Sequence, residues 1–224
     1  NEIKSEVSYY FTEKNGDNQS AYLDIKNYNY VGKKNQRDIN SLINILRSYV
    51  TKSTDYQYIN HAQKKYGNVP LWVLTNALTF GNISKMYMLL SQDIQSRISK
   101  NYLGINESQM VSILTVLVKF RNVCAHGERL FTYKTVDSIP DLPIHKKLDI
   151  TQKGKQYING KNDLFAVVIA LKYLLNDVWY KEFIKELKKV IDSYLRKHDS
   201  IQEQELYEKM GFPENWRKIT RYRK

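Results

Sequence analysis

The chain of 224 residues is poor in cysteine, proline and glycine, with one, four and nine of these residues. A single cysteine, Cys124, excludes an intrachain disulfide, and the sequence has no cluster of cysteines spaced for a metal site. We therefore predict no metal and no other cofactor. We also expect Cys124 to be a buried, reduced thiol of a cytoplasmic protein.

Long hydrophobic runs are also missing. No apolar run approaches the roughly 18 to 20 residues that a membrane-spanning helix needs. The longest, residues 164–175, is interrupted by Lys172 and indicates a core helix. The sequence also lacks a Gly-rich phosphate loop, a Ser-His-Asp order and a carboxylate pair, so it offers no other familiar chemistry. We expect no membrane partner.

Acidic residues are outnumbered by basic ones, 23 to 35, which gives a formal net charge of +12. Such a balance favours a polyanionic partner such as RNA. A lysine-rich surface that reflects a genome rich in A and T explains the same charge, and both interpretations stay open. The hydrophobic fraction of 42% is that of a globular protein, and the chain is long enough for one sizeable core.

The apolar residues recur at helical spacing, which predicts an all-α fold. Pro70 is expected to open the helix at 71–80, a Gly81-Asn82 pair to break it, and Asp163 to cap the helix at 164–179. We interpret the chain as one helical domain over residues 1–224, with an N-terminal part at 1–68, a motif-bearing core at 69–179 and a C-terminal helix and basic tail at 180–224. The predicted helices are 3–11, 38–49, 56–66, 71–80, 85–90, 94–98, a motif helix from 108, 164–179 and 182–196, with an extended loop at 139–150.

Four polar residues follow the apolar run at 110–120, where the pattern calls for more apolar ones. A helix advances about 100° per residue, so Asn122 and His126 share a face, Arg121 lies at its edge and Arg129 follows one turn later. Gly127 supports a helix end just past the histidine, and residues 117, 118 and 123–125 can keep the segment packed. Guanidinium groups suit phosphate oxygens, and imidazole can give and take a proton near neutrality. The alternative is that His126 and Arg129 only cap the helix.

The spacing Arg-Asn, three residues, His resembles the signature of the HEPN superfamily. Longer stretches are similar to Abi-like proteins (abortive infection, AbiD/AbiF type), and together they cover roughly residues 3–175. Family members often carry a second histidine where Gly127 stands. The chain opens without Met inside what resembles a family helix, so we expect an N-terminal segment before it. The similar stretches are VPLWVL at 69–74, LTFGNIS at 78–84, RNVCAHGERL at 121–130, PDLPI at 140–144 and NDLFA at 162–166.

The resemblance implies a HEPN-like helical bundle with extra helices and a proline-containing loop. It also implies a metal-independent ribonuclease of bacterial phage defence, a toxin whose site is completed at a homodimer interface. Cleaving RNA without a metal needs a base, an acid and cationic donors for the phosphate, and one motif supplies a single imidazole. We assign His126 to acid–base work and Arg121 to the phosphate, with Asn122 orienting His126 or binding substrate and Arg129 as a second phosphate contact.

Two other functions stay open. The chain could hold a noncoding RNA or a tRNA without cutting it, or it could be an inhibitory protein partner in a defence or toxin–antitoxin system, where an antitoxin is a possible partner. Basic residues also surround Trp216 and Tyr222 in the tail, which suits single-stranded RNA, although a solvated tail explains them too. The remaining histidines, His61, His145 and His198, are expected to be structural or solvent-facing. The tail residues assigned to RNA are Arg217, Lys218, Arg221 and Arg223.

Overall fold

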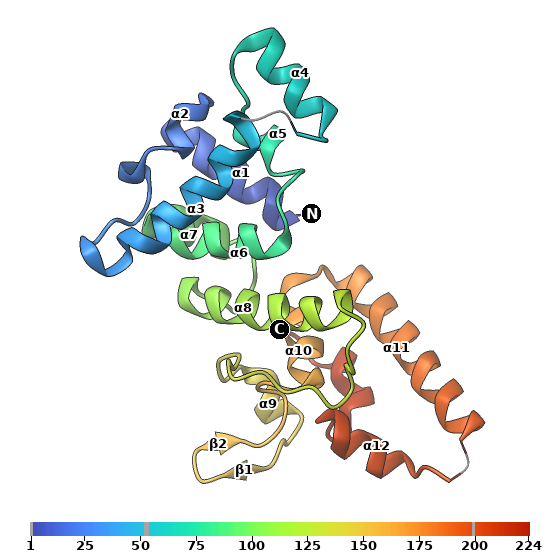
Figure 1. The fold of residues 1–224 in the computed structure, drawn as a ribbon. Helices are drawn as coiled ribbons and strands as arrows, with labels where there is room; N and C mark the ends of the chain where they lie inside the picture. Colours follow the sequence, from blue (N-terminus) through green and yellow to red (C-terminus); the bar gives the residue numbers. More distant parts are fainter. Residues whose placement is uncertain (1, 52–53, 199) are drawn as a thin grey trace. The chain divides into compact units, whose positions relative to one another are not determined.

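The computed structural model describes residues 2–51, 54–198 and 200–224. It contains two compact units, Asn1–Asn101 and Tyr102–Lys224, and each unit has its own buried core. In the described ranges every regular element is a helix except one short hairpin, so the fold is all-α, as predicted (Figure 1). One domain over the whole chain stays a prediction.

The first unit is a cluster of helices around α1 and α3. The helix α1 packs against α5, α6 and α7, while α3 packs against α4 and α6. On α3 the buried side chains Ile39, Leu42, Leu46 and Val50 recur every three or four residues, which is the pattern of a helix with one core-facing stripe. The elements are α1 (Glu2–Asn15), α2 (Gln19–Tyr22), η1 (Ile25–Asn27), α3 (Lys33–Thr51), α4 (Gln57–Tyr66), α5 (Leu71–Leu74), α6 (Phe80–Leu89) and α7 (Gln92–Ser99).

Several predicted helix boundaries in this unit are wrong, since α3 begins at Lys33 and α6 at Phe80, not at residues 38 and 85. The helix that Pro70 opens ends at Leu74, not at residue 80. The Gly81-Asn82 pair does not break a helix, because it lies in the first turn of α6. There the Thr79 hydroxyl oxygen accepts a hydrogen bond from the Asn82 backbone N–H at 3.2 Å. First-turn N–H groups have no partner inside the helix, so a capping side chain decides where α6 begins.

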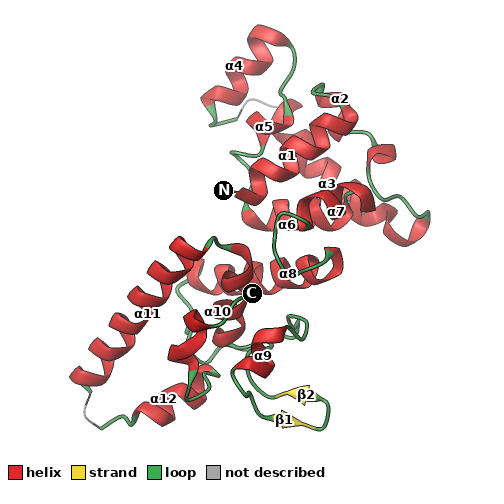
Figure 2. Cartoon of the chain, turned by 180° about the vertical axis from the view of Figure 1, so that it is seen from behind, coloured by secondary structure: helices red, strands yellow, loops and turns green. Residues whose placement is uncertain are grey.

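The second unit is organised on α8, which packs against α10; α10 in turn packs against α11, and η2 against α11. Figure 2 shows the long irregular connection after α8 and the small hairpin of β1 and β2 beyond α9. The two strands are antiparallel, with Gln152 opposite Tyr157. The elements are α8 (Glu107–Ala125), α9 (Pro143–Lys147), β1 (Gln152–Lys153), β2 (Gln156–Tyr157), α10 (Leu164–Leu174), α11 (Asp177–Lys197), α12 (Glu203–Met210) and η2 (Trp216–Arg221).

The Asp163 cap is confirmed, since its carboxylate accepts a hydrogen bond from the Ala166 backbone N–H at 3.0 Å. The helix that it begins is shorter than predicted. It ends at Leu174, and Asn176 caps a new helix by accepting a bond from the Trp179 N–H at 2.9 Å. The segment at 139–150 is not wholly extended, because Pro143 opens the short helix α9.

Buried polar groups clamp the turn at Gly160 onto the start of α10. His145 is fully buried, and its Nε2 lies 2.8 Å from the Gly160 carbonyl oxygen, while the Leu142 N–H donates to its Nδ1 at 3.1 Å. Because a carbonyl can only accept, Nε2 carries the proton of a neutral ring. The Gly160 N–H donates to Asp163 at 3.0 Å, so both backbone polar groups of Gly160 are held. A Cβ on Gly160 would lie 2.8 Å from Ile169.

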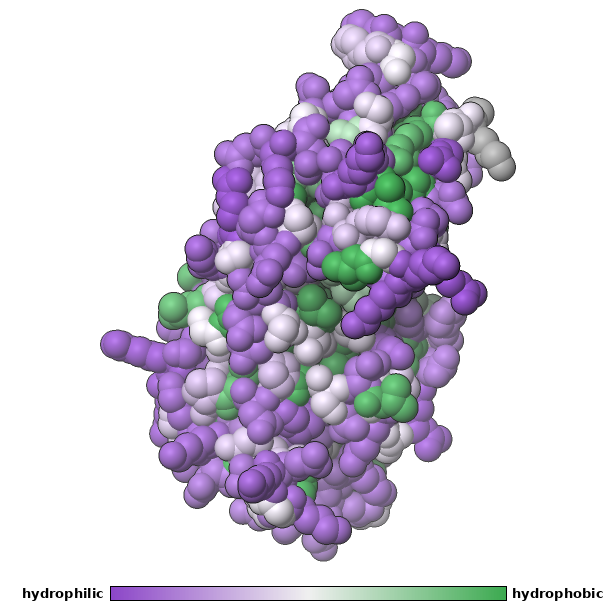
Figure 3. Space-filling model, turned by 90° about the vertical axis from the view of Figure 1, so that its left-hand side faces the viewer, coloured by the Kyte–Doolittle hydropathy of each residue, from purple (hydrophilic) through white to green (hydrophobic). Residues whose placement is uncertain are grey.

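On the face shown in Figure 3 most residues are hydrophilic, and the hydrophobic ones form separate groups among them. In the described ranges no helix is both long and apolar enough to cross a membrane.

Candidate functional site

The helix α8 carries the motif and is fixed at its start by a capping box. The Asn106 side chain accepts a hydrogen bond from the Gln109 N–H, and the Gln109 side chain accepts one from the Asn106 N–H, both at 2.9 Å. One face of the helix is buried in the core of the second unit. This face is made by Met110, Ile113, Leu114, Val116, Phe120 and Val123.

The helix ends at the motif through a Schellman turn. The Gly127 N–H donates to the Cys124 carbonyl at 3.2 Å, and the Glu128 N–H donates to the Val123 carbonyl at 3.1 Å. Gly127 has φ +67°, a left-handed conformation that glycine adopts without strain. The prediction that Gly127 ends the helix just past His126 is confirmed.

Three of the four predicted motif residues lie together on the exposed end of this helix. Asn122 and His126 are one turn apart, and the His126 N–H donates to the Asn122 carbonyl at 3.0 Å. Arg121 reaches the Asn122 side-chain oxygen at 3.4 Å, at the outer limit of a hydrogen bond. All three residues are exposed. Within the described residues the His126 ring has no hydrogen-bond partner and Arg121 has no salt bridge.

Two expectations about this segment are wrong. Arg129 does not continue the helical face, because α8 ends at Ala125 and Arg129 lies in the following loop, its guanidinium carbon 5.8 Å from the Phe131 ring centroid. Cys124 is exposed, not buried. In this last turn of α8 Val123 is buried, whereas Cys124 and Ala125 are exposed, although the helical repeat places Cys124 one turn after the buried Phe120.

The loop after the motif is tied back to the second unit, which keeps the helix end ordered. Tyr133 packs edge-to-face on Phe120 with ring centroids 5.0 Å apart, and Asp137 pairs with Lys119 at 3.1 Å. Further along, the Thr135 N–H donates to the Asn162 carbonyl at 2.9 Å. The motif side chains are therefore presented on a fixed backbone.

The site is cationic and lies at the negative end of a helix dipole, where positive side chains are favoured. Its imidazole can exchange a proton, and its guanidinium can bind a phosphate, so it could serve phosphate chemistry. In the part of the chain that the structure describes, no group of three or more His, Cys, Asp or Glu side chains is placed to hold a metal ion.

The basic tail is folded and is not a solvated extension. Trp216 is fully buried against Tyr207 and Phe212, so its ring is closed to RNA bases. Arg217 is neutralised by Asp192 at 2.6 Å and Glu203 at 3.2 Å.

The other three tail residues assigned to RNA, Lys218, Arg221 and Arg223, are exposed. Within the described residues none of them has a salt bridge, so their charges are not neutralised. Sequence reasoning missed Lys172, which is buried beside this tail. Its signal was a lysine in an otherwise apolar helix, because such a group needs partners.

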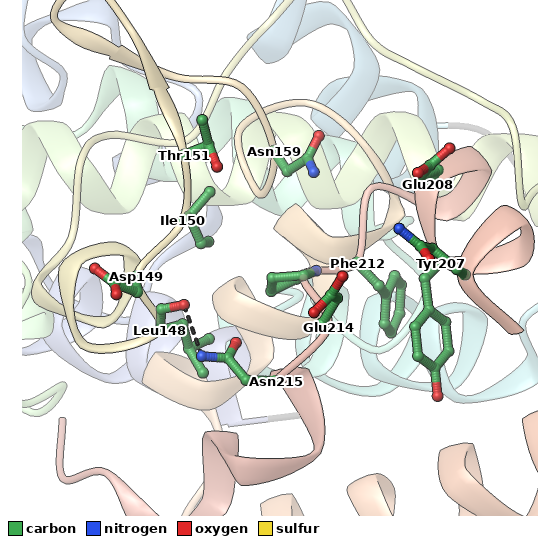
Figure 4. Close-up of a pocket in the computed structure, with 12 residues that line it drawn as sticks. Leu148, Asp149, Ile150, Thr151, Asn159, Tyr207, Glu208, Phe212, Glu214 and Asn215 are labelled. Atoms are coloured by element: carbon green, nitrogen blue, oxygen red, sulfur yellow. Dashed lines mark hydrogen bonds between the residues drawn. The ribbon is translucent and has the colours of Figure 1, made fainter.

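A hollow of the second unit is acidic and unsuited to RNA. It measures about 390 Å³, and its charged lining residues are Asp149, Glu208 and Glu214. Figure 4 shows these carboxylates around it, with the Asn215 amide donating to the Leu148 carbonyl at 3.0 Å. Like charges would repel a phosphate here, so the exposed end of α8 is the better place for an anionic substrate.

The chain is all-α and presents Arg121, Asn122 and His126 at an exposed helix end. Comparison with known proteins gives its family. Residues 1–132 match the sequence model of the family described as Abi-like protein, which spans the motif and more than half of the chain. The chain belongs to this family. Membership suggests a role in abortive infection, a form of phage defence.

The match ends before the similar stretches at 140–144 and 162–166. No curated protein and no solved structure matches the chain.

Proposed function

We propose that the chain is a metal-independent endoribonuclease of bacterial phage defence, of the abortive-infection or toxin type, with a HEPN-like site. One observation carries the proposal: His126, Arg121 and Asn122 share an exposed helix end, and the His126 ring bonds no other described residue. Polar groups without a structural task, placed together on an ordered backbone, are what a site for substrate needs.

The chemistry follows from these groups. A base takes the proton of the 2′-hydroxyl, whose oxygen attacks the adjacent phosphorus, and an acid protonates the departing 5′-oxygen. The products carry a 2′,3′-cyclic phosphate, or a 3′-phosphate after hydrolysis, and a 5′-hydroxyl. Arg121 neutralises the charge that grows on the phosphate, and Asn122 orients the ring or binds the substrate. Arg129 gives a second phosphate contact from the loop.

A homodimer supplies what one chain lacks. The exposed end of α8 offers one imidazole, whereas an in-line reaction uses a base and an acid on opposite sides of the phosphate. A two-fold axis through this surface would place two copies of His126 at one phosphate. The partners in this proposal are RNA and a second copy of the chain.

The test is incubation of purified protein with total bacterial RNA in EDTA. Wild type and a His61→Ala control, which removes an exposed histidine of the first unit, should cleave the RNA. His126→Ala should leave the RNA intact while still binding it. Cleavage by His126→Ala at the wild-type rate would overturn the assignment.

Arg121→Ala, paired with Arg47→Ala as a control for loss of an exposed arginine, tests the phosphate role. Arg121→Ala should slow cleavage about 100-fold, while Arg47→Ala should leave it unchanged.

A second candidate function is an RNA-binding module that does not cut, for a noncoding RNA or a tRNA. The observation that favours it is the set of exposed cations without carboxylate partners, on the motif and on the tail, in a chain of net charge +12. This function predicts intact RNA with both wild type and His126→Ala, RNA that co-purifies, and an affinity that falls steeply with salt.

A further inference from the structure

A second cationic site lies in the second unit, where the end of η2 and the residues after it meet α10 and α11. A hollow of about 500 Å³ opens there, and we call it the basic pocket. Five cations and one carboxylate line it, so its charged lining carries five minus one, or +4. The lining residues are Leu103, Lys172, Asp177, Tyr180, Lys181, Thr220, Arg221, Tyr222, Arg223 and Lys224.

Lys172 anchors this pocket from the core. It is 4% exposed, and its ammonium donates to the carbonyls of Ile219 at 3.0 Å and Tyr222 at 2.7 Å. The same ammonium lies 5.1 Å from the centroid of the Tyr180 ring. Tyr180 is 3% exposed, and its hydroxyl has no hydrogen-bond partner within the described residues. The pocket therefore combines a buried cation with an unsatisfied buried hydroxyl.

Two lysine-to-carbonyl bonds, and no carboxylate of the described residues, hold the end of this segment. Lys224 donates to the Leu175 carbonyl at 2.6 Å, and Lys147 donates to the Arg223 carbonyl at 2.8 Å. Lysine-to-carbonyl bonds fix this segment but leave its positive charge in place. In the described part of the chain none of the five lining cations forms a salt bridge, in contrast to Arg217 nearby.

The pKa of Lys172 reflects first its burial and then the charges around it. Burial, together with repulsion from Lys224 and Lys147, lowers the pKa of Lys172 to about 8, and only Asp177 acts in the opposite direction. A bound anion would favour the charged ammonium and offset that repulsion.

We propose that the basic pocket binds a nucleotide through its terminal phosphate, carried either by a free nucleotide or by an end of an RNA chain. A terminal phosphate has one ester substituent and can reach a recessed cation, whereas an internal phosphodiester is substituted on both sides and carries less charge. The volume is that of a small-molecule site and exceeds what phosphate alone would fill. Leu103 and Tyr222 supply apolar surface for the sugar or base.

The proposal goes beyond RNA cleavage and does not depend on it, because no residue of the α8 motif lines this pocket. Its test therefore uses the wild-type chain and an RNA that cannot be cut by 2′-hydroxyl attack. Short 2′-O-methyl RNAs with a fluorophore at one end carry either a phosphate or a hydroxyl at the other, in both orientations. Fluorescence anisotropy at fixed ionic strength measures their binding, and adenosine 5′-monophosphate and adenosine serve as competitors.

At least one phosphate-ended RNA should bind roughly tenfold tighter than its hydroxyl counterpart, or adenosine 5′-monophosphate should compete roughly tenfold better than adenosine. The double variant Arg221→Ala/Arg223→Ala should remove the preference. The control Lys155→Ala/Lys197→Ala removes the same charge from exposed residues outside the pocket and should retain the preference. If thermal melting shows that the arginine variant is unfolded, Lys181→Ala on α11 replaces it.

The pattern of preference distinguishes the sources. Discrimination between RNA ends without nucleotide competition identifies an RNA end, and nucleotide competition alone identifies a free nucleotide. Equal binding of phosphate and hydroxyl forms in both series, or a preference that survives the pocket variants, would overturn the proposal.

Discussion

His126 and His145 lie in the same unit, and the structure treats them in opposite ways. The His126 ring stands exposed at the end of α8 with no partner among the described residues, whereas His145 is fully buried and both of its ring nitrogens are hydrogen-bonded. The first is available to a ligand and contributes little to folding. The second is committed to the fold. Burial together with satisfied hydrogen bonds, more than residue type, separates a structural histidine from one that is open to a ligand.

The largest effect should come from the exposed histidine. His126→Ala should lower RNA cleavage by about 100-fold or more, since general acid–base groups contribute on that scale. Its free energy of unfolding should stay within about 0.5 kcal/mol of wild type, because the ring is exposed and bonds no other described residue. Cleavage assays and urea denaturation on the same samples check both parts. A large loss of stability would remove the contrast with His145.

The buried histidine should show the reverse. His145→Ala leaves the Gly160 carbonyl and the Leu142 N–H unpaired in the core and opens a cavity, which should lower the free energy of unfolding by about 3 kcal/mol. Cleavage per folded molecule should be unchanged. Urea denaturation, with His61→Ala as the exposed control, measures the difference. Equal stability of the two variants would contradict the clamp at Gly160.

The contribution of Asp163 to stability depends on pH, which gives a further test of the turn that His145 holds. Burial raises the pKa of Asp163 to about 6 against the bonds from Gly160 and Ala166. The folded protein therefore holds this proton more tightly than the unfolded chain. The resulting stability is full below about pH 4 and is lost as pH rises through about 6.

Asp163→Asn removes that titration. The difference in the free energy of unfolding between the variant and wild type should shift by about 2 kcal/mol in favour of the variant as the pH rises from about 4.5 to about 7.5. Burial lowers the pKa of His145, which acts in the opposite direction, but this contribution is common to both proteins and cancels in the difference. Denaturation curves at the two pH values give the result. A pH-independent difference would show that Asp163 does not titrate there.

The smallest effect concerns the tail, where bonded and unbonded cations are neighbours. Arg217→Ala should destabilise the protein by about 1 kcal/mol, because Arg217 pairs with Asp192 and Glu203 at a partly solvated site. Lys218→Ala should change stability by less than about 0.3 kcal/mol, since Lys218 is exposed. Thermal melts at low and high salt check both, and the Arg217 effect should shrink with salt.

Local patterns predicted the features that depend on local geometry. Asp163 before an apolar run, Gly127 after the motif helix, and Asn122 and His126 on one face all follow from capping preferences and the helical repeat. Arg129 was misplaced because its position depends on where α8 stops, and one residue of left-handed backbone at Gly127 redirects the chain.

Features that depend on distant partners could not be read from the sequence. Lys172 is satisfied by the carbonyls of Ile219 and Tyr222, 47 and 50 residues away. The burial of Trp216 likewise depends on Tyr207 and Phe212 from another element. A composition of basic and aromatic residues does not reveal which rings are buried. It therefore predicted that the tail stacks on RNA bases, although Trp216 belongs to the core.

The exposure of Cys124 turns the chain's only thiol into a chemical handle. A maleimide dye or spin label would attach at one position of the 224, on the last turn of α8 between Asn122 and His126. Cys124 is turned about 200° around the helix from Asn122, so the signal would report on the last turn of α8 from beside the motif: quenching on addition of RNA, or dipolar coupling between two labels if two copies of that helix end come together. No cysteine has to be removed or introduced to place the reporter there.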